Sequence, residues 1–86
     1  MTSNLVSQWI RYAADNGGDT TAQITRRMLA CNEIEKYAPQ QPVPPATRSL
    51  VSQWMAYACH PTGDRTADLS RSMIAGREIC VALRIN

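Results

Sequence analysis

The sequence is poor in the residues and motifs from which catalytic and metal sites are usually built. It contains one histidine, His60, and neither a glycine-rich phosphate loop nor a suitably spaced pair of carboxylates. Cys59 and His60 are adjacent, so their side chains point apart, and no nucleophile motif supports a more distant cysteine–histidine pair. We therefore expect a protein that is not an enzyme, uses no cofactor or metal, and has no small-molecule substrate.

The chain also lacks the patterns of exported and membrane proteins. No run of 18 apolar residues occurs, and the N-terminus has no basic stretch followed by an apolar core. The three cysteines, Cys31, Cys59 and Cys80, are odd in number and include no CxxC pair, which is typical of free thiols. These features predict a cytoplasmic protein that does not interact with membranes.

The charge is modest, although its composition is biased. A net charge of +2 is too small to indicate the basic surface of a nucleic-acid-binding protein. Of the nine basic residues, only Lys36 is a lysine and the rest are arginines. Arginine is enriched at protein interfaces, but a GC-rich coding sequence would produce the same bias. The composition therefore favours a binding surface only slightly.

What the sequence does contain is an internal repeat. Residues 5–38 align without a gap on residues 50–83, at an offset of 45, with 16 identities in 34 positions. The pentapeptide LVSQW occurs at the start of both segments. Such self-similarity indicates two copies of one structural unit. Each copy is shorter than the roughly 40 residues needed to fold unaided, so we expect the copies to pack on each other or on a second chain.

Each copy has the hydrophobic pattern of two helices joined by a turn. At about 100° per residue, the apolar side chains of each predicted helix fall in one arc. Asn16-Gly17-Gly18 and Pro61-Thr62-Gly63 are helix stops, while Asp19-Thr20 and Asp64 are helix starts, and Thr20 with Gln23 has the form of a capping box. The predicted core residues are, helix by helix, Leu5, Val6, Trp9, Ile10, Tyr12 and Ala13; Ile24, Met28, Cys31, Ile34 and Ala38; Leu50, Val51, Trp54, Met55, Tyr57 and Ala58; and Leu69, Met73, Gly76, Ile79 and Leu83.

These elements predict an all-α fold in which two tandem helical hairpins form a four-helix bundle. Residues 1–86 would be a single domain, with one hairpin in 2–38, a proline-rich linker in 39–46 and a second hairpin in 47–86. The extended linker is long enough to allow either a parallel or an antiparallel arrangement of the hairpins. We expect Trp9 and Trp54 to lie where the hairpins meet. Gly76, aligned with Cys31, would let another backbone approach closely.

The second helix of each copy carries a stripe that is repeated in the other copy. Small and apolar residues lie beside an arginine and an acid on what we interpret as the solvent side of the helix. Such a face suits contact with a protein partner or with a second copy of the chain, with arginine as the anchor. The predicted partner-binding residues are Ala22, Arg26, Leu29, Ala30 and Glu33, and Ala67, Arg71, Ile74, Ala75 and Glu78. Recent duplication alone would also explain their identity in the two copies.

The favoured function is a non-enzymatic protein-binding module, an adaptor or inhibitor of a host or partner protein, consistent in size with small accessory proteins of phages and plasmids. The alternative is a small DNA-binding regulator, because residues 67–79 faintly resemble a helix-turn-helix segment. In that interpretation the second helix of each copy breaks near Leu29 or Ile74. Neither residue is the small one that readily adopts a positive φ at such a corner, so we expect continuous helices.

Overall fold

A computed structural model of the chain describes residues 2–15 and 18–85, and these are helical apart from their connections. The helices are α1 (Thr2–Ala13), α2 (Thr20–Glu35), α3 (Pro45–Cys59) and α4 (Arg65–Leu83). The all-α class and the order of four helices are thus confirmed. Asn16 and Gly17, at the predicted end of the first helix, lie outside the described residues. No helix in the described part of the chain is both long and apolar enough to span a bilayer.

Aspartate side chains cap the starts of α2 and α4. Asp19 Oδ1 accepts a hydrogen bond from the Ala22 amide at 2.8 Å, and Asp64 Oδ1 accepts one from the Thr66 amide at 2.9 Å. The preceding glycines, Gly18 and Gly63, have φ of 83° and 85°, a conformation that favours glycine. Both starts, at Asp19-Thr20 and at Asp64, are as predicted, although the side chain that caps α2 is Asp19 and not Thr20 of the expected capping box.

The linker is shorter and more firmly attached than predicted. α3 begins at Pro45, which lies within the expected linker of 39–46. Proline is accommodated at the first position of a helix because its missing N–H would have no partner there. Gln41 Nε2 donates to the Glu35 carbonyl at 2.7 Å, and Val43 is buried in the core. The linker therefore caps α2 and contributes to packing, beyond acting as a spacer.

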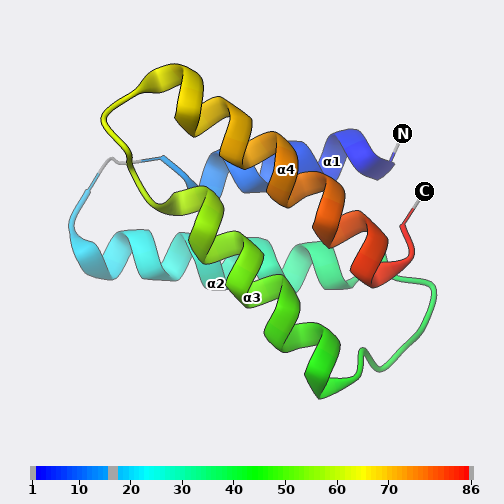
Figure 1. Cartoon of the computed structure of the whole chain (residues 1–86). Coiled ribbons are helices and arrows are strands. Elements are labelled where there is room, and N and C mark those ends of the chain that lie inside the picture. The colour runs from blue at the N-terminus through cyan, green and yellow to red at the C-terminus, as the bar shows by residue number, and fades with distance from the viewer. Residues whose placement is uncertain (1, 16–17, 86) are drawn as a thin grey trace.

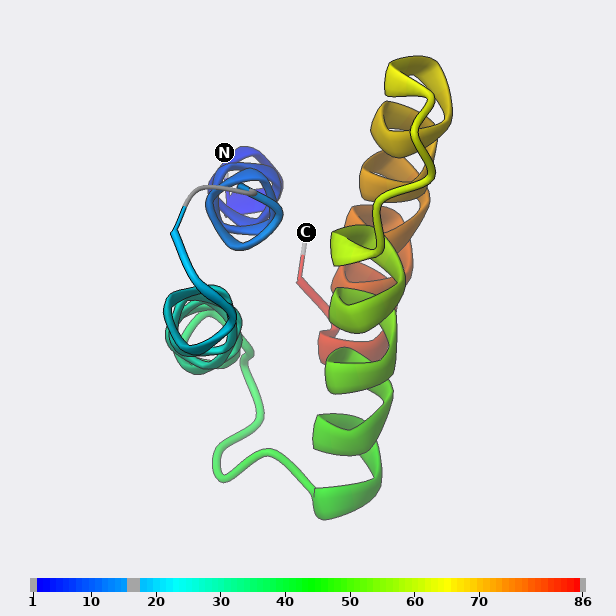
Figure 2. The same cartoon turned by 90° about the vertical axis from the view of Figure 1, so that its left-hand side faces the viewer.

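The two hairpins form two layers that cross. α1 packs beside α2 and α3 packs beside α4, while α1 also contacts both helices of the other layer (Figure 1). Figure 2 shows α1 and α2 nearly end-on, whereas α3 and α4 are seen along their length. The hairpins are therefore neither parallel nor antiparallel, the two arrangements considered from the linker length.

Core positions in the two hairpins correspond at the offset of 45 residues. The buried pairs are Val6 and Val51, Ile10 and Met55, Ala13 and Ala58, Ala30 and Ala75, Ile34 and Ile79, and Ala38 and Leu83. Val43 and Ile85 complete the buried apolar cluster. Several of these residues are alanines, which allow the backbones of neighbouring helices to approach closely.

The tryptophans lie at the edge of this core. Trp9 is half-buried, meets the Tyr12 ring edge-to-face at 5.5 Å, and donates its indole N–H to the Tyr37 hydroxyl at 3.3 Å. Trp54 and Tyr57 form the same edge-to-face pair at 5.5 Å. The fully buried large side chains are instead aliphatic, such as Ile10 and Met55.

The predicted inner faces of α2 and α4 are rotated by roughly 45–60° from the observed ones. Ile24, Met28, Leu69 and Met73 were assigned to the core, but each is exposed. Ala30 and Ala75 were assigned to the solvent side, yet both are fully buried. In the first helices, Leu5, Tyr12 and Leu50 are likewise exposed and not in the core. Large apolar side chains had been taken to mark the inner face, whereas close helix packing places alanines there.

Gly76 is buried at the crossing of α4 with α1, as expected for a close approach. A Cβ at this position would lie 3.4 Å from Ile10 Cδ1 and 3.8 Å from Ser7 Oγ. α4 also packs more extensively on α1 than α2 packs on α3, where Cys31 takes the place of the glycine. The exchange of Cys31 for Gly76 is thus one difference between the two inter-hairpin contacts.

The rotation of α2 is tested by comparing two isoleucines. Ile34→Ala should lower the free energy of unfolding by about 2–5 kcal/mol because it leaves a cavity in the core. Ile24→Ala, at a side chain that is 47% exposed, should cost less than about 1 kcal/mol. Urea denaturation measures both values. A larger loss for Ile24→Ala than for Ile34→Ala would show that the inner face of α2 is the one predicted from the sequence.

The space around Gly76 determines whether a larger side chain there stabilises or destabilises the protein. The methyl group of Gly76→Ala fits at ordinary contact distance, so the gain in helix propensity should stabilise the protein by about 0.5–1 kcal/mol. Gly76→Leu should cost about 1–3 kcal/mol through overpacking against α1. Urea denaturation again gives both values, and a Leu variant as stable as the Ala variant would show that α4 and α1 are not in close contact.

Candidate functional site

The predicted partner-binding residues do not form one surface in the structure. Ala30 and Ala75 are core residues, so their assignment to an exposed face is corrected. Leu29 and Ile74 are exposed, at 43% and 45%. The remaining six are half-buried beside the core: Ala22, Arg26, Glu33, Ala67, Arg71 and Glu78.

The two arginines of the predicted stripe contact their own hairpins. An Arg26 guanidinium nitrogen (Nη2) donates to the carbonyl of Asp15 at 2.8 Å, just beyond the end of α1. The Arg71 guanidinium lies over the Tyr57 ring of α3, 4.9 Å from its centre. Each arginine therefore links the second helix of a hairpin to the first one. These contacts give the repeated arginines a role in the fold itself.

Large exposed apolar residues also occur at matching places in the two hairpins. Most of them form pairs that are 45 residues apart: Leu5 and Leu50, Ile24 and Leu69, Met28 and Met73, and Leu29 and Ile74. The methionines are the most exposed of these, at 62% and 75%. We call the residues of the last three pairs the outer apolar residues of α2 and α4. The sequence analysis placed four of these six in the core, and no signal in the sequence alone showed that Ala30 and Ala75 face inwards instead.

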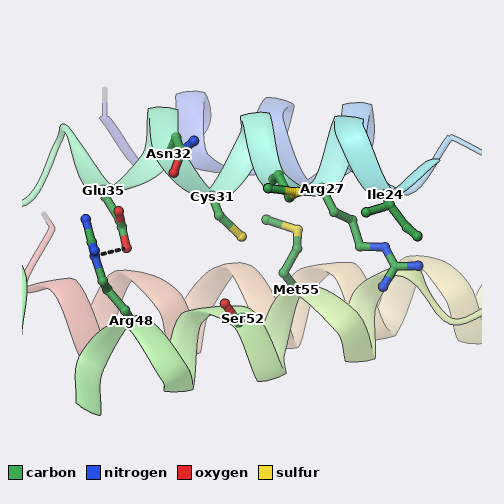
Figure 3. A pocket seen from close by; sticks show the side chains of 9 residues that line it. Ile24, Arg27, Cys31, Asn32, Glu35, Arg48, Ser52 and Met55 are labelled. Carbon is green, nitrogen blue, oxygen red and sulfur yellow. Dashed lines mark ion pairs between the residues drawn. The ribbon is translucent and has the colours of Figure 1, made fainter. Parts of the chain in front are cut away.

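A groove of about 390 Å³ separates α2 from α3. Met55 forms its buried floor, and Figure 3 shows Met55 and Cys31 facing one another across it. Its lining residues are Ile24, Arg27, Met28, Cys31, Asn32 and Glu35 of α2, and Arg48, Ser52 and Met55 of α3. At the corresponding contact between the two hairpins, Gly76 brings α4 against Ile10 of α1.

The two ends of the groove differ in charge. At one end, Arg48 Nε and Glu35 Oε1 form an ion pair at 3.1 Å that joins the two helices (Figure 3). Towards the other end, the Arg27 side chain extends from α2 into the space between the helices. Its Nε is buried and has no hydrogen-bond partner within the described residues. The groove thus has an ion pair at one end and, towards the other, a buried guanidinium N–H without a partner.

The thiol in the groove is held in its neutral form. Burial, and next the Glu35 carboxylate, raise the pKa of Cys31 to about 11, while Arg27 acts in the opposite direction. Burial also raises the pKa of Cys59, which again lies near Arg27. A protonated thiol is a poor nucleophile, so at neutral pH Cys31 acts as a small apolar wall. Within residues 2–15 and 18–85, no group of three or more metal-binding side chains comes together.

The helix-turn-helix interpretation does not agree with the backbone. α2 and α4 run through Leu29 and Ile74 without interruption. Among the described non-glycine residues, only Arg84, at the end of α4, has a positive φ. The expectation of continuous helices is confirmed, and the broken-helix geometry on which the DNA-binding alternative was based is wrong. Comparisons with protein-family models, curated proteins and solved structures find no match to this chain.

Thiol alkylation should report the environment of Cys31. Because the pKa of Cys31 in the folded state is raised to about 11, the thiolate is scarce at pH 8. The alkylation rate should therefore keep rising until the pH reaches about 11. The stabilisation linked to the neutral thiol is present below the unfolded pKa of about 9 and is lost as pH rises through the folded value. Iodoacetamide labelling followed by peptide mass spectrometry measures the rate, with the urea-unfolded chain as control. Equal rates at pH 8 in the folded and unfolded chains would contradict this environment.

Proposed function

We propose that this chain is a non-catalytic protein-binding module, an adaptor or inhibitor that contacts its partner through the outer apolar residues of α2 and α4. The observation that supports this most is their occurrence in pairs: Ile24 and Leu69, Met28 and Met73, and Leu29 and Ile74 are all exposed. Small domains gain stability by burying such side chains, so their exposure at corresponding positions of both hairpins supports contact with a partner. Flexible methionines are frequent at surfaces that adapt to a partner.

We propose in addition that the two hairpins are copies of one unit. The sequence identity of 16 in 34 positions supports this, as do the corresponding buried pairs and aspartate caps. A duplicated unit offers two similar surfaces, one on α2 and one on α4. Such a module suits a symmetric partner, two partner molecules, or a second copy of itself. The proposal includes a cytoplasmic location, which agrees with the free thiols expected from the sequence.

The outer apolar residues can be tested without disturbing the groove. Leu29→Glu/Ile74→Glu places a charge on each surface, and neither residue lines the groove between α2 and α3. Gln8→Glu/Gln53→Glu is the matched control, because it adds the same charge at exposed, corresponding positions of α1 and α3. Sedimentation at micromolar concentration and affinity capture from a host lysate measure self-association and partner binding.

We expect wild type and the control to bind equally, and the Leu29→Glu/Ile74→Glu variant to bind at least about tenfold more weakly, as for central interface residues. Circular dichroism should show the same helix content in all three proteins, because the substituted residues are exposed. The proposed function would be overturned if the wild type is strictly monomeric and captures the same proteins as the variant.

A further inference from the structure

Arg27 places a positive charge in the groove between α2 and α3, and one of its N–H donors is buried without a partner. The Arg48 guanidinium pairs with Glu35, but the buried Nε of Arg27 has no hydrogen-bond partner within the described residues. A buried donor without a partner has lost its hydration and gained nothing in return. A carboxylate would supply the missing acceptor through a charge-assisted hydrogen bond, which is the stronger type.

The negative charge in the groove lies away from this donor. Glu35 is two helical turns from Arg27 on α2, about 12 Å at 1.5 Å per residue, and it is engaged by Arg48. The stretch between them is lined by Met28, by Cys31 with its neutral thiol and by the buried Met55. The groove therefore presents a guanidinium followed by an apolar surface, with polar groups again at the far end.

Its dimensions suit a small molecule better than a partner helix. A volume of about 390 Å³ lies in the range of small-molecule sites. A ten-residue helix, about 15 Å long and 10 Å wide, occupies roughly 1,200 Å³. The Glu35–Arg48 ion pair also bridges α2 and α3 directly, which closes one end of the groove to a helix passing through it.

We propose that the α2–α3 groove binds a small amphipathic carboxylate, with its carboxylate on Arg27 and its apolar part against Met28, Cys31 and Met55. The corresponding contact between α1 and α4 lacks this site for two reasons. Ser72 replaces Arg27, and Gly76 in place of Cys31 allows α4 to pack against Ile10. The site therefore distinguishes the two halves of a chain whose cores correspond closely.

Octanoate is a suitable probe, and amide chemical shifts of the isotopically labelled full chain report where it binds. We expect saturable shifts for the groove residues of α2 and α3, and none for Leu69 and Met73 of α4. Wild type should bind octanoate at least about tenfold more tightly than 1-octanol, which has the same chain and no charge. Arg27→Gln should abolish that difference, whereas Arg65→Gln, at an exposed arginine outside the groove, should preserve it.

A second variant controls for an indirect effect of the Arg27→Gln substitution. Ser52→Leu fills the groove from the exposed side of α3 and should abolish octanoate binding while thermal unfolding shows that the fold is kept. Leu29→Glu/Ile74→Glu should bind octanoate normally, so failure of the protein-binding proposal and failure of this one are distinguishable. Absence of saturable shifts, equal octanoate affinity in Arg27→Gln and wild type, or shifts on α4 as large as those in the groove would each overturn the proposed site.

Discussion

The structure depends on the close approach of helices at positions occupied by alanine and glycine. Ala30 and Ala75 are fully buried, and Gly76 lies directly against Ile10. Dispersion attraction falls off steeply with distance, so two helices gain most where small side chains bring many atoms into contact. Once these positions turn inwards, Ile34 and Ile79, one turn along their helices, become the large core residues. The orientation of every other side chain on α2 and α4 follows from this choice.

One consequence is the set of large apolar residues that remain in solvent. With an alanine on the inner face, Met28 and Met73 cannot also point inwards, because they lie far from it around the helix. Their exposure forgoes burial energy of the order of 1.5–3 kcal/mol for each side chain. Large apolar side chains are exposed at corresponding positions in both hairpins. We therefore connect their exposure with function. The arginines of the same helices contribute to the hairpins instead, through Asp15 and Tyr57.

The other consequence is an asymmetry between two otherwise corresponding contacts. α1 and α4 meet at Gly76, whereas Cys31 lies between α2 and α3, and a groove remains there. The same substitution places a neutral thiol beside Arg27, whose Nε has no partner. Two of the sequence differences between the halves, at 27/72 and at 31/76, contribute to this asymmetry. Ile24 and Met28 belong both to the outer apolar residues and to the groove lining, whereas Leu29 and Ile74 lie outside the groove and allow the two features to be tested separately.

Much of the secondary structure was determined by the sequence itself, because helix periodicity, aspartate caps and glycine turns are local properties. The close approach at Gly76 was also predictable, since only glycine has no Cβ. The inner face of α2 and α4 was not, because Ile24 and Ala30 each lie on a plausible apolar arc and only contacts with other helices select between them. The crossing of the hairpins and the α2–α3 groove were likewise decided by tertiary packing. They depend on which side chains meet between segments far apart in the chain, and helical periodicity carries no information about that.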